Sequence, residues 1–462
     1  MKTWNGIFGA AVLLLAGWVG AGPEQAVRPN FLILVGDDIS AESIGCYGSR
    51  NPHTSPNIDR LAKEGIRFTN MFVSEAICAP TRAELYTGLQ PHRNGCMQNH
   101  KATKIGTLSV VQHLEKLGYR VGLTGKTHFK PQSVYPFEKV KGFISNCNAR
   151  GVKPDDWDGV VEFMTRNVDQ PFCLFICSVH AHAPWDSGDT SHWTLDELKL
   201  PPHMVDTAKT RELYREHLAE VRLFDGQVGQ AQTLLEKFGL DDSTALIVLD
   251  ENGAGMPCGK WTTYDWGVRS ACVIKWPGAS AFETDALAQY CDILPTLIDA
   301  GGGSAPADLD GKSLLPLIQG QTKTHREKAF FTYTSGPEGP PFDSRAVTDG
   351  RYKLMWNLTP DNLFAVRVIN GFDFGYEDKM KDRHVRQLYR SWLEQAESDP
   401  DAAQKVQRFR KQPEFQLYDL KTDPWEMNNL ADNPEVAPKL QELKASISGW
   451  MAQQGDRGFN ED

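Results

Sequence analysis

NFLILVGDD, at residues 30–38, is the segment that decides the fold class. Its continuous apolar run suits a strand that is buried on both faces of a parallel sheet. Similar apolar runs lie at residues 119–123, 172–178, 245–249 and 271–276. Helical patterns lie between them, at residues 57–64, 107–117, 210–237 and 287–300. Strands that alternate with helices in this way predict an α/β fold with a mainly parallel sheet flanked by helices.

The alternation stops near residue 340, where Gly and Pro cluster in a loop at residues 335–341. Shorter elements follow, and they are predicted as strands at 345–347, 352–356 and 415–418, a charged helical stretch around 377–410 and a helix at 436–453. We therefore expect a catalytic domain over residues 27–340 and a smaller α+β domain over residues 341–462.

The amino terminus has the pattern of a secretory signal peptide. Lys2 precedes an apolar run at residues 7–19, and small residues follow at 20–22. The run is shorter than the roughly 20 residues that a membrane span needs. We expect residues 1–22 to be removed on export to the periplasm or the medium, which leaves no membrane span after processing.

Charge and cysteine content argue against a nucleic-acid-binding protein and against a small protein held together by disulfide bonds. The 49 Lys and Arg against 59 Asp and Glu give a net charge of −10, which argues against nucleic acid as a partner. An anionic substrate therefore needs a local cationic pocket. Nine cysteines in 462 residues are too few for a disulfide framework, and their odd number leaves at least one thiol outside intramolecular pairing.

The segment EAICAPTRAELYTG, at residues 75–88, is the most informative about chemistry. Pro80 suits the first turn of a helix and Gly88 suits its end, which predicts Cys78 at a helix N-terminus. Backbone N–H groups and the helix dipole favour negative charge there. Arg82 lies one turn further along the same face. These residues alone leave two interpretations open: a nucleophile for an oxyanion substrate, or a buried structural cysteine.

The segment from Cys78 to Arg82 resembles the Cys-x-Pro-x-Arg signature of the type I sulfatases, a family of the alkaline phosphatase superfamily. Other segments resemble further blocks of that family in order and spacing, and they are residues 37–38, 55–62, 65–68, 125–128, 259–262, 276–278 and 417–429. The resemblance runs from about residue 30 to about residue 435. It implies an alkaline-phosphatase-like fold and the hydrolysis of sulfuric esters.

In that family the cysteine is oxidised after translation to formylglycine (3-oxoalanine). The resemblance therefore implies that Cys78 is the catalytic position and that a maturation enzyme acts on the chain. One hydroxyl of the hydrated aldehyde attacks sulfur, and the second then loses its proton, which expels sulfate and restores the aldehyde. The resemblance also implies a sulfated carbohydrate as substrate, such as a polysaccharide or a sugar derived from a glycosaminoglycan.

Adjacent carboxylates follow the first predicted strand, at Asp37 and Asp38. Oxygen ligands at such a position suit a hard divalent cation, which can polarise sulfate and lower the pKa of the attacking hydroxyl. The alternative interpretation is a turn or a helix cap. The resemblance implies one Ca²⁺ per site, held by Asp37, Asp38, the residue at Cys78 and a second pair further along the chain.

The second pair departs from the family pattern. The family usually shows Ser-Asp-Asn-Gly after a strand, whereas this chain has Asp-Glu-Asn-Gly at residues 250–253. Aligning the sequences on Asn-Gly makes Glu251 and Asn252 the expected ligands. Asp250 remains the alternative to Glu251.

Lys126 and His128 follow the strand predicted at residues 119–123, and they resemble the family's Gly-Lys-x-His block. An ammonium at this position can bind a sulfuryl oxygen, and a neutral imidazole can accept the hydroxyl proton when sulfate is released. Arg82 and Lys260 complete the cationic wall that the resemblance implies. Lys260 could bind the leaving sulfate or donate toward the bridging oxygen.

A further histidine is expected after the strand at residues 172–178. The family shows Pro-His-x-Pro there, so His182, two residues before Pro184, is the match. Ala181 replaces the usual proline, and His180 remains a competitor.

Three alternative functions remain open. A sulfamidase would cleave an N-sulfate like that of N-sulfoglucosamine and would differ only in the leaving group. A phosphatase or phosphonate monoester hydrolase of the same superfamily would share the metal and nucleophile positions and differ in the anion pocket. The third is a catalytically dead protein that binds sulfated glycans, which applies if Cys78 is never converted.

Overall fold

The computed structural model describes residues 1–2, 28–147, 155–375 and 384–458. The expected signal peptide at residues 1–22 therefore lies almost wholly outside the described residues. Within these ranges, no helix combines the length and the apolar character that crossing a membrane requires.

Within the described residues, nine strands form a large sheet whose centre is parallel. β1 (Asn30–Gly36) lies between β5 (Phe172–Cys177) and β6 (Thr244–Asp250) and runs parallel to both. β3 (Arg120–Gly125) extends the parallel part beyond β5, whereas β7 (Arg269–Lys275) pairs antiparallel with β6. The remaining strands are β2 (Ile66–Phe72), β4 (Glu138–Lys139), β8 (Phe282–Thr284) and β9 (Ala288–Gln289). The predicted α/β class with a mainly parallel sheet is confirmed.

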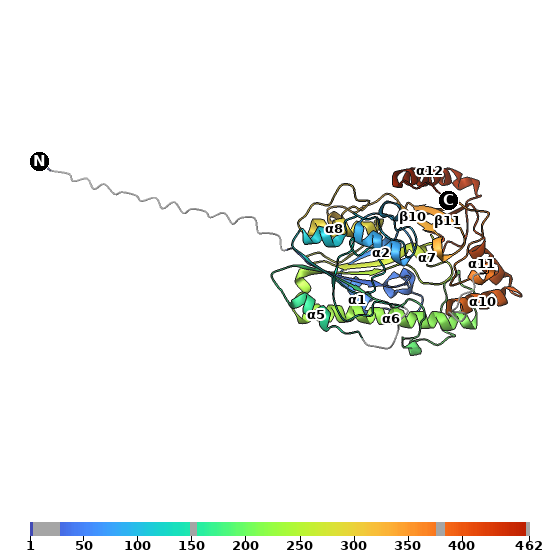
Figure 1. The fold of residues 1–462 in the computed structure, drawn as a ribbon, viewed down its shortest axis with the longest axis horizontal. Helices are drawn as coiled ribbons and strands as arrows, with labels where there is room; N and C mark the ends of the chain where they lie inside the picture. Colours follow the sequence, from blue (N-terminus) through green and yellow to red (C-terminus); the bar gives the residue numbers. More distant parts are fainter. Residues whose placement is uncertain (3–27, 148–154, 376–383, 459–462) are drawn as a thin grey trace.

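Helices cover both faces of this sheet (Figure 1). One face carries α1 (Pro56–Glu64), α5 (Asp158–Thr165) and α6 (Ala208–Lys237). The other face carries α2 (Cys78–Thr87), α4 (Val110–Glu115) and α8 (Ile293–Ala300). Three short helices are α3 (Pro91–Asn94), α7 (Asp265–Val268) and α9 (Leu315–Ile318). Polar residues at the ends of the central strands are therefore enclosed on both sides.

α6 illustrates why these segments form helices. The Thr207 hydroxyl accepts a hydrogen bond from the Thr210 N–H and so caps the helix. Its apolar residues then recur at helical spacing on one buried face, and they include Leu218, Val221, Phe224, Val228, Ala231 and Leu235. The helix predicted at residues 287–300 starts later than expected, because Ala288 and Gln289 instead pair with β2 as strand β9.

A second, antiparallel sheet forms the carboxy-terminal part of the molecule. Its strands are β10 (Ala329–Thr334), β11 (Asp343–Thr348), β12 (Tyr352–Asn357) and β13 (Phe415–Asp419). α12 (Ala437–Gln454) packs against it through Leu443 and Ile447. β10 pairs with β11 along its whole length, so the boundary expected at residue 340 falls between two strands of one sheet.

The charged stretch expected around residues 377–410 contains two helices in its described part. They are α10 (His384–Ala396) and α11 (Pro400–Arg410). The chain breaks between them because the Asp399 side chain accepts hydrogen bonds from Asp401 N and Ala402 N, and Pro400 opens the second helix. Trp392 of α10 is fully buried and donates to the Thr210 hydroxyl of α6 at 2.8 Å.

A buried ion cluster joins the small sheet to the large one. Lys353 of β12 is fully buried, and its Nζ lies 2.5 Å from Asp265 Oδ1 and 3.1 Å from Glu426 Oε1. Glu426 also accepts a hydrogen bond from Asp265 N at 2.7 Å. Asp265 opens α7, directly after the loop that carries Lys260. A strand of the small sheet therefore fixes the position of the loop that carries Lys260, which precedes the small sheet in the sequence.

Lys353→Ala should destabilise the protein by about 3–5 kcal/mol, because it leaves two buried carboxylates without their cation. Urea unfolding followed by circular dichroism measures this change. Lys275→Ala is the control, since Lys275 pairs with Glu64 at 3.4 Å on the surface, and it should change stability by less than about 0.5 kcal/mol. Equal effects of the two substitutions would contradict the role of the cluster.

Candidate active site

The carboxyl ends of the central strands bring the expected site residues together. Asp37 and Asp38 follow β1, Lys126 follows β3, and Glu251 follows β6. β1 lies between β5 and β6, and β3 lies next to β5. Ligand sites of open α/β sheets form at this edge. Parallel pairing thus converts residues far apart in sequence into neighbours.

Cys78 is the first residue of α2, as expected, with Pro80 in the first turn and Gly88 in the left-handed conformation at the end (φ 66°). The side chain is 1% exposed, and Lys260 Nζ donates to its sulfur at 2.9 Å. Burial raises the pKa of the Cys78 thiol well above its ordinary value. Because the thiolate is the reactive form, an unconverted cysteine here is a poor nucleophile.

Four buried side chains form a cluster that can hold a metal ion. One ligand atom from each of Asp37, Asp38, Cys78 and Glu251 lies within 4.8 Å of the others. Asn252 donates from Nδ2 to Asp38 Oδ1 at 2.9 Å, while its buried Oδ1 has no hydrogen-bond partner among the described residues. Burial and the nearby Glu251 carboxylate raise the pKa of Asp37. An unpartnered oxygen beside crowded carboxylates fits a hard divalent cation.

The side chains of Glu251 and Asp250 point to different sides of the sheet edge. Glu251 belongs to the cluster, where Arg82 Nε and Lys126 Nζ lie 2.5 and 3.1 Å from its two oxygens. Successive side chains of a strand point to opposite faces. Asp250 accordingly lies beside Gly36, and a Cβ placed on that glycine would be 3.2 Å from Asp250 Oδ1 and 3.1 Å from Phe224. The Asp250 carboxyl therefore faces the side that α6 covers.

Three cations balance the three carboxylates. Lys126 Nζ lies 2.7 and 2.8 Å from the two oxygens of Asp37, and Lys260 Nζ lies 2.8 and 2.9 Å from those of Asp38. Arg82 supplies the third positive charge through Glu251. Three charges of each sign sum to zero, so a bound divalent cation would leave a net charge of +2. Such a site attracts an anionic ester despite the negative charge of the whole chain.

His182 faces the cluster and His180 does not. His182 Nε2 lies 3.8 Å from Asp38 Oδ2, whereas His180 Nδ1 lies 3.5 Å from Glu220 Oε2. His182 Nδ1 donates to the carbonyl of Ala183 at 2.7 Å, which leaves the lone pair on Nε2. Burial lowers the pKa of His182 to about 3, so the ring is neutral near pH 7.

His128 lies beside the same charges. Burial, followed by the positive charge of Lys126, lowers its pKa to about 2. Its Nε2 lies 2.8 Å from Nδ1 of His100, a residue that no sequence pattern singled out. His217 of α6 was also missed, and its Nε2 donates to the Asp38 carbonyl at 3.1 Å. The apolar spacing of α6 could have placed His217 on its buried face, whereas nothing local to His100 indicates its neighbour.

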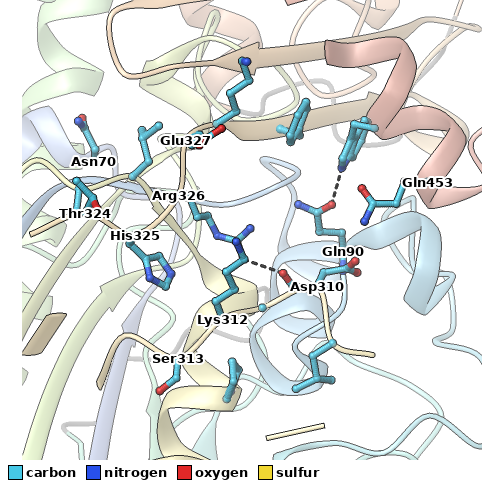
Figure 2. A pocket seen from close by; sticks show the side chains of 18 of the residues that line it. Asn70, Gln90, Asp310, Lys312, Ser313, Thr324, His325, Arg326, Glu327 and Gln453 are labelled. Carbon is cyan, nitrogen blue, oxygen red and sulfur yellow. Dashed lines mark hydrogen bonds between the residues drawn. The ribbon is translucent and has the colours of Figure 1, made fainter. Parts of the chain in front are cut away.

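A separate hollow of about 1490 Å³ lies between the loops at residues 305–313 and 323–328 and the end of α12 (Figure 2). None of the residues of the cluster lines it. Polar groups in the hollow pair with one another: Arg326 donates to the Asp310 carbonyl at 2.8 Å, and Trp450 donates to Gln90 Oε1 at 2.7 Å. Because these groups are paired with one another and no residue of the cluster lines the hollow, the cluster at the sheet edge is the candidate active site.

Comparisons with known proteins identify the family of the chain. The family described as Sulfatase matches residues 29–303, and the family described as N-sulphoglucosamine sulphohydrolase, C-terminal, matches residues 258–366. The chain is 31% identical over 438 residues to an ulvan-active sulfatase of Formosa agariphila, covering 93% of this chain and 81% of that relative. It is 29% identical over 414 residues to human arylsulfatase A, covering 74% and 77% respectively.

Solved structures share the fold. One is a complex with the substrate D-glucosamine-2-N,6-O-disulfate, with a TM-score of 0.69 and 21% identity over 93% of this chain and 99% of that one. Another is a 2-O GAG sulfatase, with a TM-score of 0.67 and 19% identity over 93% of each chain. At these identities the comparison concerns the fold, and the shared fold includes both sheets.

Glu251→Gln should abolish calcium binding, whereas Asp250→Asn should leave it within about threefold of the unsubstituted protein. The first substitution removes a charged ligand from the cluster, and the second changes a carboxyl on the opposite side of the strand. Isothermal titration calorimetry with CaCl₂ on metal-free protein measures both. Loss of binding in Asp250→Asn together with its retention in Glu251→Gln would exchange the two assignments.

Proposed function

We propose, because the chain belongs to the sulfatase family, that it hydrolyses sulfate esters on a sulfated polysaccharide with one Ca²⁺ and a formylglycine made from Cys78. The observation that carries the proposal is the position of Cys78. It lies at the start of α2, within one cluster with Asp37, Asp38 and Glu251 and in contact with Lys260. A nucleophile made from Cys78 would therefore lie between the proposed ligands of the cation and the proposed anion-binding groups.

The cation site would consist of Asp37, Asp38, Glu251, Asn252 and the residue at position 78. A bound Ca²⁺ polarises the sulfate group and lowers the pKa of the attacking hydroxyl. The formylglycine hydrate supplies two hydroxyl groups on one carbon, which a coded side chain does not offer. A Ca²⁺ ion fits the buried side-chain oxygens of the cluster, including the unpartnered Oδ1 of Asn252. The formylglycine fits position 78, where the raised pKa makes an unconverted thiol unreactive.

The cations of the site bind the sulfuryl oxygens. Lys126 and Lys260 are both 2% exposed, so their charges act in a region from which water is largely excluded. Arg82 is fully buried, and its Nη2 has no hydrogen-bond partner among the described residues. Lys260, in contact with residue 78, is also placed to donate a proton to the bridging oxygen of the ester.

The neutral histidines move the protons. His182 presents the lone pair of Nε2 beside Asp38 and accepts the proton of the attacking hydroxyl. His128, which lies near Lys126, accepts the proton of the second hydroxyl when sulfate is released. Their lowered pKa values keep both rings unprotonated before each step.

The substrate class comes from the relatives. An ulvan-active sulfatase and an N-acetylglucosamine-6-O-sulfatase, which is 21% identical over 98% of this chain, both support a sulfated carbohydrate. Export to the periplasm or medium after removal of residues 1–22, and conversion of Cys78 by a maturation enzyme, belong to the same proposal. Polysaccharide substrates lie outside the cell, which agrees with an exported enzyme.

N-sulfate hydrolysis is a second candidate. The match of residues 258–366 to the N-sulphoglucosamine sulphohydrolase C-terminal family favours it, as does 24% identity to the human enzyme of that name over 96% of this chain. Matured protein should be compared on ulvan oligosaccharides, N-sulfoglucosamine and aryl phosphate. Release of sulfate from ulvan oligosaccharides at the highest kcat/KM supports the proposal. Preference for N-sulfoglucosamine or for phosphate would replace it with the sulfamidase or the phosphatase.

Cys78→Ala should fold normally and lose sulfate release entirely, because no other side chain in the cluster supplies two hydroxyl groups. Peptide mass spectrometry of the unsubstituted protein, made together with a maturation enzyme, should find the aldehyde or its hydrate at position 78. Cys173→Ala is the matched control, since Cys173 is a fully buried thiol within β5 and should keep full turnover. Sulfate release by Cys78→Ala would end the proposed mechanism.

Chelation should lower the thermal midpoint of the purified protein. A ligand that binds only the native state at about 100 times its Kd stabilises it by about 2.7 kcal/mol. Differential scanning calorimetry with CaCl₂ and with excess EDTA measures the difference. Asp38→Asn, which weakens the site, should respond less to EDTA. Equal midpoints of the unsubstituted protein in both buffers would show that Asp37 and Asp38 form a turn and not a metal site.

A further inference from the structure

Two histidines from different loops meet beside the catalytic cluster. His100 lies in the loop between α3 and α4, and His128 follows β3. His128 Nε2 and His100 Nδ1 are 2.8 Å apart, and the ring centroids are 4.7 Å apart. His100 is exposed, whereas His128 is partly buried next to Lys126. His100 therefore touches the ring on its solvent side.

Both residues adopt a backbone conformation that side chains disfavour. The φ angle is 61° at His100 and 42° at His128. Non-glycine residues rarely occupy this region, and such strain persists where surrounding contacts hold it. Strain of this kind clusters at functional sites, and here it occurs at two residues in hydrogen-bond contact.

The loop that carries His100 is held on both sides of this residue. Asn99 Nδ2 donates to Glu338 Oε1 at 2.6 Å. Thr103 N donates to the Lys130 carbonyl at 2.9 Å, and the Thr103 hydroxyl lies 2.5 Å from that of Tyr135. Lys130 and Tyr135 belong to the segment that continues from His128. The two histidines are thus fixed to each other by contacts outside the pair.

The hydrogen bond joins Nε2 of His128 to Nδ1 of His100, and either ring can supply its proton, so the donor sets which nitrogen of His128 carries the N–H. A neutral imidazole has one N–H and one lone pair, and burial keeps His128 neutral by lowering its pKa to about 2. When Nε2–H donates to Nδ1 of His100, Nδ1 of His128 keeps its lone pair. The opposite arrangement would put the proton on Nδ1 and leave no acceptor for a hydroxyl proton.

We propose that His100 is a positioning residue that holds His128 as the Nε2–H tautomer and so keeps Nδ1 ready to accept a proton. The proposal rests on the proposed sulfatase function. When sulfate is released, the hydroxyl proton at residue 78 moves to His128 Nδ1. The electron pair left on oxygen forms the carbonyl, and sulfate departs with the electrons of the carbon–oxygen bond.

Two substitutions separate positioning from other roles. His100→Ala should lower kcat about 10–100-fold, the usual effect of losing the partner that orients a functional histidine, with KM changed less than about twofold. His100→Asn should stay within about threefold of the unsubstituted enzyme, because its side-chain oxygen accepts at nearly the position of Nδ1 and Asn tolerates positive φ. His53→Ala is the matched control, since His53 is exposed and also has positive φ (68°). It should leave kcat unchanged.

The tautomer of His128 can be determined without any measurement of enzyme activity. Nitrogen-15 NMR of histidine-labelled protein with unconverted Cys78, assigned with His128→Gln, should show His128 as the Nε2–H tautomer. In His100→Ala the two tautomers should mix, and in His100→Asn the single tautomer should return. Unchanged melting by circular dichroism confirms that the variants fold.

Several results would overturn the proposal. They are an Nδ1–H tautomer in the unsubstituted protein, an unchanged tautomer in His100→Ala, or a kcat for His100→Asn as low as that for His100→Ala. The last result would assign His100 to proton transfer instead of positioning. Failure of the sulfatase function would look different, since the unsubstituted matured enzyme would release no sulfate while the NMR signature stayed intact.

Discussion

Buried charges must be paired, and this constraint organises the whole site. Asp37, Asp38 and Glu251 are almost fully buried at the edge of the large sheet. Isolated carboxylates in such a place would be strongly destabilising. Each is compensated by a cation from another element: Lys126 after β3, Lys260 in the loop before α7, and Arg82 in α2. Pairing the charges thus fixes the segments of Lys126 and Lys260 to the end of β1, and α2 to the end of β6.

The same pairing prepares the chemistry of a sulfatase. In the proposed function, the cations that compensate the carboxylates would bind the sulfate oxygens once a divalent ion takes their partners. Neutral histidines surround them, because the burial that makes the charges costly also lowers the pKa values of His128 and His182. The small sheet contributes through Lys353, which holds Asp265 and Glu426 beside the loop of Lys260. This contact gives a structural reason for the carboxy-terminal block around Glu426 that resembles the sulfatase family.

Much of the fold could be predicted because its signals are local. Apolar runs of strand length, separated by amphipathic helices, were enough for the parallel core, and the confirmed family followed from the ordered motifs. β2 was missed because buried and half-buried residues mix along it and its register shifts between Phe68 and Met71. β9 was taken for the start of a helix, since its strand character comes only from pairing with β2.

The fold class, the family and the cluster residues Asp37, Asp38 and Cys78 could be predicted from the sequence alone, because each rests on residue type and spacing along the chain. Tertiary structure decided which way neighbouring side chains face. In the folded chain the Glu251 side chain lies in the cluster, whereas Asp250 lies away from it. His182 lies near Asp38, whereas His180 lies near Glu220. Tertiary structure alone brought His100 to His128. Contacts of this kind depend on how loops from separate elements pack, and no local pattern in the chain records that packing.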